Sequence, residues 1–130
     1  MGRAFLAKDR IHDAIAQYRE ALAIAPENVA AQRNLAWLLA TSADPSLRNG
    51  LEAVLLAEQA SRLSGGNRPI ILRILAAAYA ETGRFTEARE TAQQALQLAE
   101  DGQSNAVLVD ALRKELALYQ MGFPYHKETR

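Results

Sequence analysis

The chain has 130 residues, 26 of them alanine, and its 15 basic residues balance its 15 acidic residues. This length suits one compact domain or a short array, and an alanine-rich chain favours helix over sheet. Zero net charge argues against a nucleic acid partner, since phosphate binding needs surplus positive charge. The absence of cysteine excludes disulfides and thiolate chemistry.

The chain shows no signal for membrane insertion or export. No apolar run approaches the ~20 residues that a membrane-spanning helix needs, and residues 1–6 lack the pattern of a signal peptide. We therefore expect no direct insertion into a membrane. The compartment is not fixed by these features, although they favour the cytoplasm slightly.

The first half of the chain predicts three helices. Apolar residues at three- and four-residue spacing place the first over 11–25, ended by Pro26, and the second over 29–41. The residues of 41–50 have turn chemistry, and Asp44-Pro45 can cap a single helical turn within them. The third helix is expected over 51–63.

The second half predicts three more helices, over 68–81, 85–98 and 105–121. Gly83 makes the turn between the first two, and Ser104 is expected to cap the last. This last helix has one polar and one apolar side, as a terminal cap requires, and a partner-donated helix is the competing interpretation. The residues from Tyr125 onward are expected to form a frayed tail.

One short pattern recurs along the chain. An acidic residue followed by alanine, with a second alanine seven residues later, occurs three times at intervals of roughly 35 to 40 residues. Small side chains at these places let helices approach closely, and large ones fill the remaining holes. The period indicates stacked helical hairpins. The alanine pairs are Ala14 and Ala21, Ala53 and Ala60, and Ala88 and Ala95.

The recurring residues resemble the tetratricopeptide repeat family, whose units are antiparallel helix pairs of about 34 residues. The resemblance implies an all-α, right-handed α-solenoid of helix hairpins with a C-terminal capping helix. The third unit matches best, through Leu72, Leu75, Ala76, Tyr79, Gly83, Phe85, Ala88, Ala95, Leu96 and Leu98. The implied division is a truncated first unit (1–28), a second unit (29–68), a third unit (69–102), the capping helix (103–122) and a tail (123–130).

Two departures from the family pattern carry expectations. The second unit has an insertion at 41–50, either a tolerated surface insertion or a specific contact loop. The family's first helix should begin about six residues before Met1, with Gly2 and Phe5 in its final turns. We therefore expect a piece of a longer, bacterial-type repeat protein, with a misplaced start of the chain as the alternative. The apolar face of the 11–25 helix would then lack cover, so copies are expected to self-associate through the truncated first unit.

In this family the first helix of each unit lines a concave groove, so the resemblance implies a partner-binding groove here. Trp37 is the leading candidate, because it is the only tryptophan and leucines already fill the core positions of its helix. Two arginines at equivalent places in successive units could hold a peptide carboxylate. Packing of Trp37 against the next unit or beneath the insertion, and ordinary solvated arginines, are the competing interpretations. The groove candidates are Arg33, Asn34, Trp37, Thr41, Arg73, Ala77 and Glu81.

The sequence offers no catalytic, cofactor-binding or metal site. His12 and His126 lack companions at ligand spacing, and no phosphate loop or nucleophile elbow occurs. We therefore expect no enzyme but a protein–protein interaction or scaffold module, which binds a peptide or helix in its groove. Two alternatives stay open: a non-catalytic accessory domain of a larger enzyme such as a glycosyltransferase, and a self-assembling scaffold.

Overall fold

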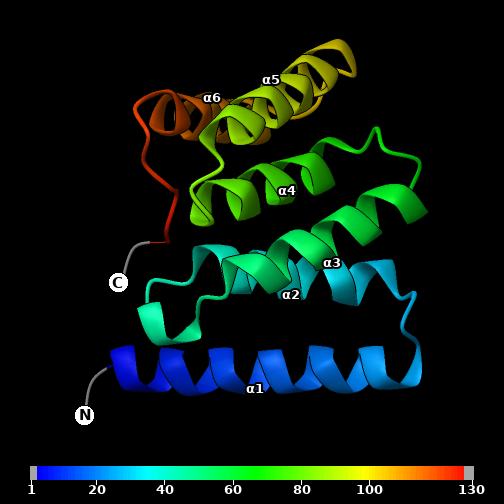
Figure 1. Ribbon diagram of the computed structural model, residues 1–130, viewed down its shortest axis with the longest axis vertical. Helices are drawn as coiled ribbons and strands as arrows, with labels where there is room; N and C mark the ends of the chain where they lie inside the picture. Colours follow the sequence, from blue (N-terminus) through cyan, green and yellow to red (C-terminus); the bar gives the residue numbers. More distant parts are fainter. Residues whose placement is uncertain (1–2, 128–130) are drawn as a thin grey trace.

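The computed structural model describes residues 3–127, with side-chain positions from residue 10 onward. The described residues form helices and no strand, which confirms the all-α prediction (Figure 1). In chain order the helices are α1 (Arg3–Ile24), α2 (Val29–Thr41), the short 3-10 helix η1 (Pro45–Leu47), α3 (Gly50–Leu63), α4 (Pro69–Glu81), α5 (Phe85–Asp101) and α6 (Ala106–Gln120).

The helices stack in the order of the chain. Each α-helix packs against the one that follows it, and α2 also packs against α4. Figure 1 shows the result as a layered stack that runs from α1 at one end to α5 and α6 at the other. This arrangement confirms the predicted solenoid of helical hairpins, in which each helix pair buries its apolar face against its neighbours.

Side-chain caps fix where several helices begin. The side chains of Asn28, Asn49 and Asn105 accept hydrogen bonds from backbone N–H groups in the first turns of α2, α3 and α6. The last cap differs from the prediction, because Asn105 rather than Ser104 accepts the hydrogen bond from Leu108 N at 2.9 Å. Both residue types cap well, so sequence alone could not separate adjacent candidates.

The start of the chain departs from the sequence prediction. The tail of a separate helix was expected around Phe5, but α1 runs without a break from Arg3 to Ile24. The segment contains no glycine or proline, so nothing in it interrupts the backbone hydrogen bonds of a helix. The expectation for Gly2 lies outside the described residues.

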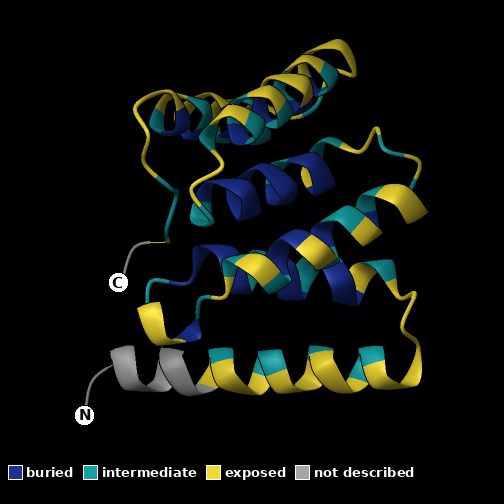
Figure 2. Cartoon of the chain, in the orientation of Figure 1, coloured by how far each residue is buried: buried dark blue, intermediate teal, exposed yellow. Residues whose placement is uncertain are grey.

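Alanine packing holds the stack together, as the recurring pattern predicts. Ala53, Ala60, Ala88 and Ala95 are each fully buried. The matching alanines of α1 are only half-buried, because α1 is covered from one side. Figure 2 shows the contrast between α4, which is buried along most of its length, and the largely exposed α1.

The insertion is a folded connection that brings α3 close to the end of α4. Asp44 accepts a hydrogen bond from Ser46 N at 2.9 Å and so caps η1, as predicted. A Cβ added to Gly50 would lie 2.8 Å from the Thr82 side chain and close to the Glu81 backbone. Glycine therefore permits the close approach of the two helices here.

Candidate functional site

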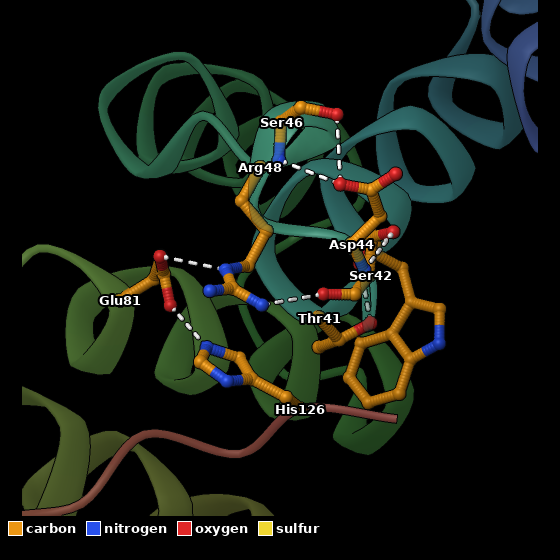
Figure 3. A network of polar contacts seen from close by, with 8 residues as sticks. Thr41, Ser42, Asp44, Ser46, Arg48, Glu81 and His126 are labelled. Atoms are coloured by element: carbon orange, nitrogen blue, oxygen red, sulfur yellow. Dashed lines mark hydrogen bonds and ion pairs between the residues drawn. The ribbon is translucent and has the colours of Figure 1, made fainter. Parts of the chain in front are cut away.

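The insertion and the end of α4 meet in a polar network, drawn in Figure 3. Arg48 Nη1 donates to the Ser42 carbonyl at 2.8 Å, and Arg48 Nε lies 3.2 Å from Glu81 Oε2, an ion pair that is not aligned as a hydrogen bond. Glu81 Oε1 contacts His126 Nε2 at 2.6 Å. One carboxylate on α4 therefore ties together the insertion and the C-terminal segment.

The C-terminal segment lies back on the stack. After Gly122 the chain leaves α6 and passes the end of α4 toward the end of α2 (Figure 1). The Lys127 backbone N–H donates to the Thr41 carbonyl at 2.7 Å. The expectation of a frayed tail is therefore wrong for Tyr125 to Lys127, which are anchored through backbone and side chains; 128–130 lie outside the described residues.

Trp37 lies at the centre of this contact. Its ring stacks on the Tyr125 ring with centroids 5.8 Å apart and planes inclined by 28°. The Arg73 guanidinium carbon lies 4.5 Å from the Trp37 ring centroid, and Lys127 Nζ lies 5.8 Å from it. Aromatic stacking and two cation–π contacts thus leave Trp37 half-buried between α4 and the tail. We call Trp37, Thr41 and Glu81, the residues that receive the tail, the tail seat.

Arg73 is engaged by a buried carboxylate on α6. Its Nε lies 2.9 Å from Glu115 Oε1, and its Nη2 lies 2.6 Å from Glu115 Oε2. The Glu115 side chain is 5% exposed and the Arg73 side chain 24%. This bidentate pair joins α4 to α6 and already gives the guanidinium a carboxylate partner.

Arg73 and Tyr125 also line a hollow of about 670 Å³ against α6. Its wall carries aliphatic side chains, among which Val107 is 79% exposed, with charged groups beside them. We call this the α6 hollow. Its other lining residues are Val107, Asp110, Ala111, Lys114, Glu115, Ala117 and Leu118.

A second hollow, of about 420 Å³, lies where α2 and α4 begin. Arg33 lines it together with Arg68 and the end of α3, whereas Arg73 does not. Arg33 and Arg73, which occupy equivalent places in successive units, therefore line different hollows. Arg73 is also already bound to Glu115.

The predicted groove residues fall into two groups in the structure. Trp37, Thr41, Arg73 and Glu81 come together around the C-terminal segment. Ala77 is fully buried within the core cluster, and Asn34 is half-buried on α2. The face is therefore built by the predicted helices, although not every candidate residue is available to a partner.

Sequence reasoning missed the residues that complete this face. Glu115, Arg48 and Tyr125 were not singled out, and the exposed Val107 was not noticed. A usable signal existed for Tyr125, since an aromatic residue in a short polar tail is unusual in a chain that is 6% aromatic. No comparable signal marks Glu115, because its burial depends on where α4 places Arg73.

Burial and charge alter the pKa of Lys127 on this face and of Tyr79 elsewhere on α4. Partial burial lowers the pKa of Lys127, and the nearby positive charge of Arg73 lowers it further. Burial, followed by the hydrogen bond to Glu58, raises the pKa of Tyr79 to about 12. The Tyr79 hydroxyl donates to Glu58 at 2.9 Å and so joins α4 to α3.

Among the described residues, no group of three or more His, Asp or Glu side chains is arranged to hold a metal ion. Within the same part of the chain no helix is both long and apolar enough to cross a membrane. What the face presents is an aromatic ring, aliphatic side chains, carboxylates and a backbone carbonyl. These groups can hold a polypeptide segment, as they hold the C-terminal one.

A family model described as "Tetratricopeptide repeat" matches residues 1–45 and 46–104. The two matched segments meet within η1 and together end just before α6. Comparison with curated proteins and comparison with solved structures each found no match.

Proposed function

Because the chain belongs to the tetratricopeptide repeat family, whose repeats generally mediate protein–protein interaction or scaffolding and are typically non-catalytic, we propose that it is a non-catalytic module that binds a partner polypeptide. The binding surface is the face shared by α2, α4 and α6. It comprises the tail seat and the α6 hollow.

One observation carries the proposal: the tail seat and the α6 hollow are continuous. Arg73 contacts Trp37 in the seat and also lines the hollow, and Tyr125 does both as well. Successive repeats thus contribute to one surface with an aromatic centre and an aliphatic extension. Aromatic side chains and arginine, both present on this surface, are typical of the positions that dominate protein interfaces.

Selection of displayed peptides on the immobilised protein tests the proposal. We expect enrichment of peptides whose binding falls at least about tenfold when Val107 is changed to Glu, since a carboxylate would then enter the α6 hollow. Leu55→Glu is the matched control, because Leu55 is a 65% exposed aliphatic residue on α3, outside the face.

The fate of the peptides in the two variants decides the outcome. If the enriched peptides still bind Leu55→Glu but no longer bind Val107→Glu, the face is supported as the binding surface. No enrichment on the parent protein, or equal binding to both variants, would contradict it.

A further inference from the structure

The C-terminal segment is held in the tail seat by contacts that do not depend on its being attached to α6. They are a ring stack on Trp37, a backbone hydrogen bond to the Thr41 carbonyl and a side-chain contact with Glu81. All three are available to any extended segment with the same side-chain order. The seat therefore has the chemistry of a recognition site.

The seat favours an aromatic ring followed by an imidazole and an ammonium group. Glu81 offers a carboxylate, which is shared between Arg48 and His126. The Trp37 ring offers a π face to Lys127. Aromatic, imidazole and ammonium groups at successive positions thus each meet a complementary partner.

The C-terminal segment fills the seat through few contacts. Through residue 127, where the described part of the chain ends, its one backbone hydrogen bond outside the α6 end is that of Lys127, and Phe123 remains 58% exposed. A segment bound by so few interactions opens at low cost.

We propose that the tail seat is a recognition site for an extended peptide with an aromatic residue followed, two positions later, by a lysine, and that the protein's own Tyr125–Lys127 segment competes with such a partner for it. This inference rests on the proposed function and specifies its ligand. A partner that lacks this order of side chains would bind in the α6 hollow without displacing the segment.

Trp37 provides the readout, because it is the only tryptophan of the chain and lies in the seat. The full chain with Tyr125→Ala and Lys127→Ala is compared with the parent. These positions lie outside the helices, so the fold should persist, and unchanged helix content by circular dichroism checks this. The tryptophan emission of the variant should shift to longer wavelength as water reaches the ring.

A synthetic peptide with the sequence of residues 122–127 is then added to both proteins. It should bind the variant at least about tenfold more tightly than the parent, since the parent's own segment occupies the seat for most of the time. A peptide carrying the same two alanine substitutions is the matched control and should bind neither protein. The single variant Tyr125→Ala should give an intermediate affinity.

Three results would overturn the proposal. They are no binding of the peptide to the variant, equal binding to parent and variant, and an unchanged tryptophan spectrum in the variant. Binding of displayed peptides in the α6 hollow alongside any of these would retain the proposed function and refute only this inference. Absence of displayed-peptide binding as well would refute both.

Discussion

At the residue scale the pair between Arg73 and Glu115 has the largest consequence. Each side chain compensates the charge of the other in a partly buried environment, where an unpaired ion would be costly. The same pair sets the position of the guanidinium over Trp37, with its central carbon 4.5 Å from the ring centroid. One buried carboxylate on α6 thus orders the face that α2 and α4 present.

Arg73→Leu should lower the free energy of unfolding by about 3 kcal/mol, because it leaves the Glu115 carboxylate buried without its partner. Denaturant unfolding measures the change. Arg113→Leu removes an exposed pair with Glu100 and should cost less than about 1 kcal/mol. Equal effects of the two substitutions would contradict the assigned role of Glu115.

Tyr79 should make stability depend on alkaline pH. Its pKa is about 12 in the folded protein, above the ordinary value of 10.0, so the folded state holds the proton more tightly. The stabilisation is therefore complete below pH 10 and is lost as the pH rises toward 12. Tyr79→Phe should show a smaller loss over this range in denaturant unfolding; an identical loss would refute the assignment.

At the scale of elements, side-chain periodicity predicted the helices well. The phased alanines and the turn residues located α2 to α6 and the single turn of η1, because these depend on local backbone preferences and short-range packing. The family pattern predicted a break between two helices after Phe5. The segment Arg3–Ile24 contains no glycine or proline to interrupt a helix, so α1 is continuous there. Local chemistry outweighed the family pattern at that point.

The candidate site was less predictable than the helices. The resemblance placed Trp37, Thr41, Arg73 and Glu81 on one face, and the structure brings them together. It did not anticipate the tail, because the docking of Tyr125 depends on residues about 45 to 90 positions away in sequence, as the contact between His126 and Glu81 illustrates. Such long-range contacts leave no periodic signal.

The junction of α3 and α4 should be sensitive to one methyl group. Gly50→Ala would put a Cβ 2.8 Å from the Thr82 side chain, so we expect it to destabilise the protein by about 1–3 kcal/mol through overpacking. Leu55→Ala, at an exposed position of the same helix, should change stability by less than about 0.5 kcal/mol. Thermal unfolding of both variants tests this, and an unaffected Gly50→Ala would refute the close approach.

At the scale of the whole molecule, the two ends of the stack differ. At one end α6 turns polar side chains outward, and Asp110, Arg113, Lys114 and Gln120 are all exposed, as a capping helix requires. At the other end the apolar face of α1 was expected to lack cover, but its Ile15, Tyr18 and Leu22 pack against the core, and Ile24 is 81% exposed.

Self-association of copies through α1 at high concentration stays a prediction, supported by the exposed Ile24. Sedimentation velocity should show a sedimentation coefficient that rises with concentration for the parent. Ile24→Asp should shift the protein toward monomer, since a charge resists burial in an interface, whereas Leu55→Asp should not. A concentration-independent monomer would contradict the prediction.

Hydrogen exchange at the Lys127 amide, followed by NMR, tests the central claim, that the face of α2 and α4 holds a polypeptide segment. This amide donates to the Thr41 carbonyl at 2.7 Å, so its exchange should be slowed about tenfold or more relative to an unstructured peptide. Tyr125→Ala should remove most of that protection. Exchange at the unstructured rate in the parent protein would show that the segment does not occupy the seat.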